Sequence, residues 1–264
     1  MNSLEQFYDN FPQLAFGDLQ SINMYKPWHA GDSVKLYNKN IKDRNAVEKL
    51  KQYGWFEVPI AYNFNKQGFR SHYNYNESSN AKVCAAFGCS NTLGEAVQEH
   101  HAWPSVLAKK VSARIYNFGV SGSSADTNYR HALYWLPKIK PESVYWLMPN
   151  MERIEMVQNP KERALYITPN EKHGYDKFYD DWAITDFNML IHQHKIISAM
   201  EQLCSSLEIN LYILLRRNFK HHDWGRDLRH PGIDTHASIA NMFYSLSTGQ
   251  SLTNKASGSI IKKI

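Results

Sequence analysis

The sequence predicts a three-layer α/β/α domain with helices on both faces of a parallel sheet. From residue 82 onward, short apolar runs alternate with longer helical patterns, and each run ends in a loop of small or polar residues. Uninterrupted apolar runs are typical of strands that are buried on both faces, and strands alternating with helices favour a parallel sheet. The chain has 264 residues, 43% hydrophobic and 21% charged, close to the globular average, so one large core is expected.

The elements follow in order from these patterns. Four strands are expected from the apolar runs, at 82–88, 114–120, 143–149 and 209–215. Four helices are expected between and after them, at 92–111, 129–139, 184–207 and 235–247. Pro104 lies inside the first helical pattern and is a candidate break. The third helix is amphipathic, and its apolar face carries Phe187, Leu190, Ile191, His194, Ile197, Met200, Leu203 and Leu207.

Three parts of the chain are distinguished by composition. Residues 1–75 have little periodicity apart from a helical pattern at 44–53, and we interpret them as an extension packed on a main domain at 76–247. Residues 248–264 form a polar, Gly/Ser-rich segment that predicts a flexible tail. The irregular stretch 151–185 has two interpretations: a cap over a binding pocket, or a solvated loop with aromatic anchors.

Charge and hydropathy disfavour several classes of function. The net charge is +5 and the basic residues are spread out, whereas a nucleic-acid binder usually gathers them in one stripe, so no nucleic-acid partner is expected. No apolar stretch reaches the roughly 20 residues of a membrane span. The first residues do not match the pattern of a secretory leader, so none is expected, and three scattered cysteines predict neither a disulfide framework nor a zinc cluster. A cytoplasmic protein is the expectation.

Small and polar residues follow the predicted strands, where ligands of parallel sheets bind. Gly88-Cys89-Ser90 follows the first strand and Asn150 follows the third. Asn117-Phe-Gly119-Val-Ser-Gly122-Ser-Ser124 spans the end of the second strand, and Asp227-Leu-Arg-His230 precedes the last helix. In order and spacing these four segments resemble the blocks of the SGNH hydrolases, also called the GDSL esterase/lipase family. The resemblance covers roughly residues 82–247 and implies a flavodoxin-like parallel sheet.

The residue types also make chemical sense as a hydrolytic site. A serine hydroxyl needs a general base, histidine suits that role near neutral pH, and a carboxylate orients the imidazole. These roles fall to Ser90, His230 and Asp227. The resemblance implies an oxyanion hole formed by the backbone N–H groups of Ser90 and Gly122 and the side chain of Asn150. Two departures stand out: Cys89 replaces the family's aspartate, and Pro-Asn-Met-Glu replaces its Gly-Gly-Asn-Asp.

The expected function is therefore hydrolysis of a small-molecule or glycan ester through an acyl-enzyme. The family resemblance implies acyl esters of lipids, simple esters or O-acetylated sugars, with no organic cofactor and no metal. Ser121 is a rival nucleophile and His236 a rival base. Each predicted residue also has an ordinary structural interpretation, as a helix cap or a turn former. Two other functions stay open: a catalytically inactive relative that serves as a carbohydrate-binding or structural module, and a sugar- or nucleic-acid-binding protein.

Overall fold

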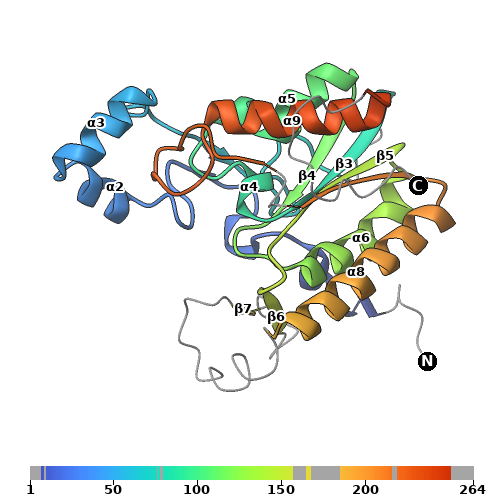
Figure 1. Ribbon diagram of the computed structural model, residues 1–264. Coiled ribbons are helices and arrows are strands. Elements are labelled where there is room, and N and C mark those ends of the chain that lie inside the picture. The colour runs from blue at the N-terminus through green and yellow to red at the C-terminus, as the bar shows by residue number, and fades with distance from the viewer. Residues whose placement is uncertain are drawn as a thin grey trace.

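The structure is a computed structural model that describes residues 7–8, 10–75, 77, 80–156, 165–167, 185–215 and 219–250. A four-stranded parallel sheet of order β4-β3-β5-β8 forms its centre (Figure 1). The strands are β3 (Val83–Gly88), β4 (Arg114–Gly119), β5 (Ser143–Met148) and β8 (Asn210–Leu215). Numbered among themselves in chain order, they run 2-1-3-4, which is the flavodoxin-like order. The predicted α/β class with a parallel sheet is confirmed.

Helices cover both faces of the sheet. Helices α5 (Trp103–Val111) and α9 (Ile233–Thr248) lie on one face, and α6 (Ala125–Ile139) and α8 (Asp186–Ser206) lie on the other (Figure 1). Successive strand residues point to opposite faces, so each strand contributes to two cores. Phe87 and Trp146 pack toward α6 and α8, whereas Ala86 and Tyr145 pack toward α5 and α9.

The prediction of a single helix at 92–111 is wrong. The segment divides into a short helix α4 (Ser90–Leu93), a 3₁₀ turn η3 (Glu99–His101) and α5. Gly94 ends α4 in the left-handed conformation with φ +80°. Pro104 is not a break, because it lies in the first turn of α5, where a missing N–H costs nothing.

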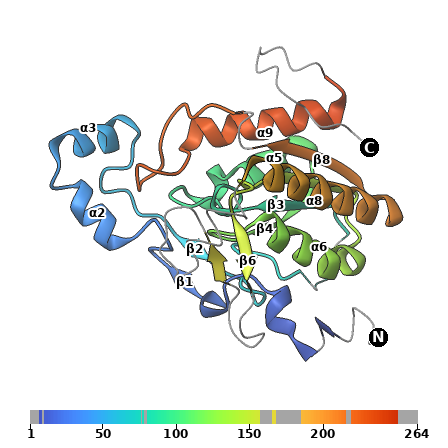
Figure 2. The same cartoon turned by 60° about the horizontal axis from the view of Figure 1, so that its bottom comes forward.

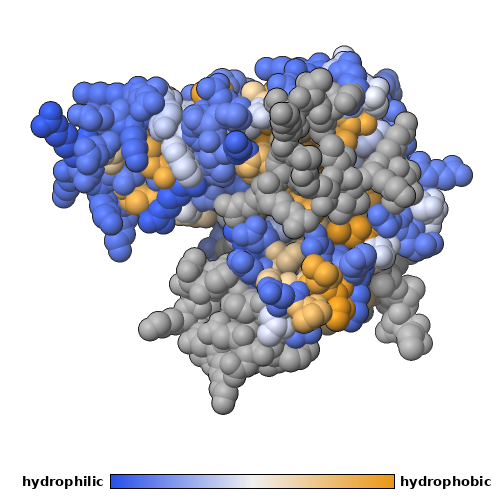
Figure 3. Space-filling view, in the orientation of Figure 1, coloured by the Kyte–Doolittle hydropathy of each residue, from blue (hydrophilic) through white to orange (hydrophobic). Residues whose placement is uncertain are grey.

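The apolar stripe predicted for α8 is buried only toward its C-terminal half. Ile197 and Met200 are buried, but Phe187, Leu190 and Ile191 are 82%, 60% and 51% exposed. Figure 3 shows apolar surface in the lower half of that view, where α6 and α8 lie in Figure 1. None of the helices in the described part of the chain combines the length and the apolar character that a membrane crossing requires.

The N-terminal residues pack on the carboxyl edge of the sheet. Their short elements are η1 (Pro12–Ala15), η2 (Leu19–Ser21), β1 (Tyr25–Lys26), α2 (Val34–Asn40), α3 (Arg44–Gln52) and β2 (Tyr62–Asn63). Strands β1 and β2 pair antiparallel, and α2 and α3 project away from the sheet (Figures 1 and 2). A third core joins the end of α3 to the residues after β3, through Leu50, Trp55, Leu93 and Val97.

The structure describes only parts of two other segments for which the sequence made predictions. From the stretch 151–185, the structure describes a small antiparallel pair, β6 (Ile154–Met156) and β7 (Leu165–Ile167), together with 151–153 and 185. Residues 157–164 and 168–184 lie outside the described residues, and so do 251–264 of the predicted tail. The cap and the flexible tail therefore stay predictions.

Candidate active site

The turn after β3 places Ser90 at the start of a helix. Gly88 ends the strand with φ +154°, and a Cβ there would lie 2.7 Å from the carbonyl oxygen of Leu147 and collide with Thr92. Glycine is therefore required for α4 to fold back against the sheet. Ser90 is the first residue of α4 and is 6% exposed, with its Oγ 4.0 Å from Cys89 Sγ.

The end of β4 is held against the same helix. Asn117 donates from Nδ2 to the carbonyl of Thr92 (2.9 Å) and accepts at Oδ1 from the N–H of Gly119 (2.9 Å). A Cβ on Gly119 would collide with the backbone nitrogen of Leu93, so this glycine permits close packing. Gly122 follows in the left-handed conformation with φ +77°. The loop 119–124 thus starts directly beside α4.

Asp227 and His230 form a tight pair in the loop before α9. His230 Nδ1 lies 2.5 Å from Asp227 Oδ2, and the other carboxylate oxygen accepts the backbone N–H groups of Arg229 and His230, both at 2.9 Å. The acceptor-only carboxylate fixes the proton on Nδ1 and leaves Nε2 for another partner. The pair therefore has the geometry of a histidine oriented by a carboxylate.

The pKa values of Asp227 and His230 are shifted in opposite directions, downward for Asp227 and upward for His230. Burial opposes charging of both groups, but mutual attraction outweighs it, so the pKa of Asp227 falls below its ordinary value. Burial likewise lowers the pKa of His230, yet the carboxylates of Glu95 and Asp227 overcome it and raise the pKa to about 9. The Cys89 side chain, next to Ser90 in the sequence, also raises the pKa of this imidazole.

Glu95 is a site residue that the sequence analysis missed. It is 1% exposed, and its carboxylate accepts hydrogen bonds from the N–H groups of Gly31 and Asp32 and from Ser121 Oγ. One of its oxygens lies within 4.8 Å of a carboxylate oxygen of Asp227 and of a ring nitrogen of His230. A charged residue inside the apolar run 92–97 was the available signal, because buried carboxylates need dedicated partners.

The loop that carries His230 contacts the segment after α4 directly. The N–H of Arg226 donates to the carbonyl of Ala96 (2.9 Å), and a Cβ on Gly225 would lie 2.7 Å from Ala96 Cβ. The described contacts include no hydrogen bond from Ser90 Oγ to the His230 ring. Catalytic hydrogen bonds are often long without substrate and tighten when it binds.

Asn150 lies two residues beyond β5, and its carbonyl accepts from the N–H of Arg153 (3.2 Å) in a turn. Its side chain lines a cavity of about 350 Å³ together with residues of α8, including Met189 and Gln193. The rival base His236 is fully buried in α9, and its Nδ1 accepts from the N–H of Trp103 (3.2 Å). Burial lowers its pKa to about 3, so His236 is neutral and packed in the core.

Within the described residues, Glu95, Asp227 and His230 are also the group whose donor atoms could surround a metal ion. Their atoms already have other partners: Asp227 Oδ2 is bonded to His230 Nδ1, and both Glu95 oxygens accept hydrogen bonds. A bound cation would have to displace these bonds. The donor set therefore fits a hydrogen-bonded cluster better than a metal centre.

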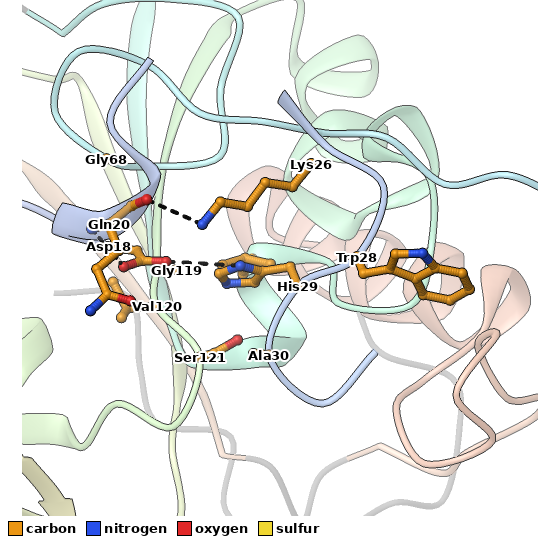
Figure 4. A pocket seen from close by; sticks show the side chains of 11 residues that line it. Asp18, Gln20, Lys26, Trp28, His29, Ala30, Gly68, Gly119, Val120 and Ser121 are labelled. Carbon is orange, nitrogen blue, oxygen red and sulfur yellow. Dashed lines mark hydrogen bonds and ion pairs between the residues drawn. The ribbon is translucent and has the colours of Figure 1, made fainter. Parts of the chain in front are cut away.

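A cavity of about 240 Å³ opens beside the β4 loop (Figure 4). The N-terminal residues contribute most of its polar groups, and Gly119, Val120 and Ser121 form the wall toward the sheet. Lys26 donates to the carbonyl of Gln20 (3.2 Å), and His29 Nδ1 lies 3.9 Å from Asp18 Oδ2. The Trp28 ring points away from these side chains (Figure 4). The cavity thus offers both donors and acceptors.

No family model matches the chain, and the search of curated proteins finds no match. Solved structures similar to it include a lipolytic protein of the G-D-S-L family from Desulfitobacterium hafniense DCB-2, at 13% identity and TM-score 0.35, over 62% of this chain and 97% of that one. Another is the esterase AlinE4, described as an SGNH-hydrolase family esterase, at 15% identity and TM-score 0.34, over 67% of this chain and 77% of that one. TM-scores this low do not bear on activity.

Proposed function

We propose that the chain is a serine hydrolase that cleaves a carboxylic ester, with Ser90 as nucleophile, His230 as general base and acid, and Asp227 as the carboxylate that orients His230. The observation that carries the proposal is the 2.5 Å contact between His230 Nδ1 and Asp227 Oδ2. This pair lies against the segment that follows Ser90, at the carboxyl edge of the sheet. Such a pair leaves Nε2 free to take a proton from a serine hydroxyl.

In the acylation half, Ser90 Oγ attacks the carbonyl carbon of the ester, and its proton passes to His230 Nε2. The resulting tetrahedral intermediate collapses when the bond to the alcohol oxygen breaks. His230 returns the proton to that oxygen, so the alcohol leaves neutral. The buried Asp227 carboxylate stabilises the imidazolium between the two transfers.

In the deacylation half, water attacks the acyl-enzyme and gives a proton to His230. The bond from the acyl carbon to Ser90 Oγ breaks, and the proton returns to Oγ. The products are one alcohol and one carboxylic acid, and no oxidant, metal or organic cofactor takes part. Both halves develop negative charge on the carbonyl oxygen, for which the backbone N–H groups of Ser90 and Gly122 and the side chain of Asn150 are the proposed donors.

The cavity beside the β4 loop supports a polar substrate, either a small-molecule ester or a glycan ester. Asp18 supplies an acceptor, Lys26 a donor, and His29 and Ser121 supply groups that can do either. A hydroxyl-rich alcohol needs such a mixed set, whereas a long acyl chain needs an apolar channel. An O-acetyl or other short acyl ester of a carbohydrate is the substrate we favour.

The test is labelling with a fluorophosphonate probe, mapped by mass spectrometry, on the full chain and on Ser90→Ala. The expected result is one labelled peptide containing Ser90, lost in the variant. Ser121→Ala is the matched control, because Ser121 is the rival nucleophile at the same edge, and it should keep the Ser90 label.

Labelling at Ser121 would overturn the assignment of the nucleophile. Folded protein that takes no label and hydrolyses no member of a panel of acetate esters would favour the inactive binding module instead. Binding of glycans that persists in Ser90→Ala would then support that alternative.

A further inference from the structure

Glu95 occupies a position that the proposed mechanism leaves unexplained. It follows the nucleophile by five residues, and its backbone N–H donates to the carbonyl of Ser90 (3.0 Å). Its side chain is nearly inaccessible to solvent. Burying a carboxylate costs several kcal/mol unless its oxygens are well paired. A side chain held at that cost next to Ser90 requires an explanation.

The partners of the Glu95 carboxylate come from two remote segments. Oε1 accepts the backbone N–H groups of Gly31 and Asp32, from the N-terminal part of the chain. Oε2 accepts the hydroxyl of Ser121, from the loop that carries the proposed oxyanion donor Gly122. Hydrogen bonds from N–H and O–H donors favour the ionised carboxylate, although burial raises the pKa of Glu95 above its ordinary value.

The same carboxylate faces the edge of the His230 ring. A Cβ added to Gly31 would lie 2.7 Å from Glu95 Oε1 and 3.3 Å from His230 Cε1, so both groups border the same small space. The groups that raise the pKa of His230 include Asp227 from its own loop, Glu95 from the segment after α4 and Cys89 from the turn after β3, and His236 of α9 also interacts with this imidazole.

We propose that Glu95 is a positioning residue of the hydrolytic site: a second carboxylate that stabilises the His230 imidazolium at the ring edge while Asp227 holds Nδ1, and that fixes the Ser121 loop beside Ser90. The mechanistic consequence rests on the proposed function, but the coupling between Glu95 and His230 does not. Because the Glu95 carboxylate borders the same space as the His230 ring and, like Asp227, raises the pKa of His230, removing the charge of Glu95 must lower that pKa.

The experiment follows the ring signals of His230 by NMR during a pH titration of the full chain, assigned with His230→Asn. In the wild-type protein the midpoint should lie near 9. In Glu95→Gln, which keeps the shape and the acceptor oxygen, it should fall by about one pH unit or more. Glu99→Gln is the matched control: Glu99 is also partly buried nearby, but it pairs with His72 at 3.1 Å, and the midpoint should not move.

Activity supplies the second measurement. In Glu95→Gln the acidic limb of the kcat/KM profile should shift to lower pH by the same amount as the NMR midpoint. A residue that only supports the fold would lower the plateau and leave the limb in place, which would overturn the proposal. An unchanged NMR midpoint in the variant, or a wild-type midpoint near the ordinary value of about 6.5, would also overturn it.

The two proposals fail separately. If Ser90 takes no label, the hydrolase proposal fails, while the titration still decides whether Glu95 acts on His230. If the midpoint does not move but Ser90 is labelled, Glu95 loses its role and the hydrolase stands.

Discussion

At the scale of single residues, the protonation of His230 controls the proposed reaction. A general base must be neutral to accept a proton, and the pKa of His230 is raised to about 9. The value of kcat/KM on a chromogenic acetate ester should therefore rise as the pH increases and level off above 9, after correction for spontaneous hydrolysis. A plateau already reached below pH 7 would contradict the electrostatic environment described for the imidazole.

Asn150 carries the second prediction at this scale. If its side-chain amide stabilises the oxyanion, Asn150→Ala should lower kcat by about 100- to 1000-fold, because a lost donor weakens the transition state more than the bound substrate. KM should change little. The control is Gln193→Ala, since Gln193 lines the same cavity from α8. Equal losses in both variants would mean that the cavity shape, and not the Asn150 amide, matters.

At the scale of elements, the short helix α4 can approach the sheet because residues 88 and 119, which it packs against, are Gly88 and Gly119. Gly119→Ala should destabilise the protein by about 1–3 kcal/mol or more, because the new Cβ would collide with the Leu93 backbone. Urea unfolding measures the loss. Gly54→Ala separates sterics from backbone strain: Gly54 has φ +74° but nothing within 4 Å of an added Cβ. The Gly54→Ala variant should lose only about 1–2 kcal/mol of unfolding free energy, the ordinary penalty for a side chain in the left-handed region. A smaller loss in Gly119→Ala than in Gly54→Ala would contradict the close-packing argument.

The sheet could be predicted from the sequence because its strands carry their own signal. Each is a largely apolar run, and the predicted bounds of all four strands agree with the structure to within one residue. Helix α4 could not be predicted in that way, since its end depends on a remote residue. Arg70 is fully buried and donates to the carbonyls of Gly94, Ala61 and Val97, the last two at 2.8 and 2.9 Å.

The same difference between local sequence signals and remote contacts decides which residues of the candidate site could be predicted. Ser90, Asp227 and His230 stand in short local motifs and were predicted from them. Glu95 was missed because its partners Gly31 and Ser121 lie 64 and 26 residues away, and the charge within residues 92–97 does not indicate which remote segments pair with it. The partial exposure of the apolar stripe of α8 could not be predicted for a different reason. Periodicity identifies an apolar face but does not show whether another element covers that face.

At the scale of the whole molecule, the N-terminal residues complete the site instead of merely covering it. The segment that presents the N–H groups of Gly31 and Asp32 to Glu95 is anchored by a buried ion pair. Arg226, next to Asp227, donates from Nη2 to Asp32 Oδ2 (2.6 Å) and from Nε to Oδ1 (3.1 Å). Tyr62 donates its hydroxyl to the same Asp32 carboxylate at 2.6 Å. One network thus joins residues 27–32, the strand β2 and the loop of the His230 pair.

The network predicts energetic coupling between Asp32, in the N-terminal part of the chain, and Arg226, in the loop before α9. Asp32→Asn and Arg226→Met should each destabilise the protein by about 3–5 kcal/mol, because each leaves a buried polar partner unsatisfied. The double variant should lose much less than the sum of the two, which gives a coupling energy of about 2 kcal/mol or more in urea unfolding. The control cycle uses Lys82 and Glu142, an exposed pair with the same 2.6 Å contact, whose coupling should stay below about 1 kcal/mol. Both single variants at the buried pair should also slow fluorophosphonate labelling of Ser90, since loosening residues 27–32 frees the Glu95 carboxylate. Additive stability losses together with unchanged labelling would mean that the N-terminal residues pack on the sheet without supporting the site.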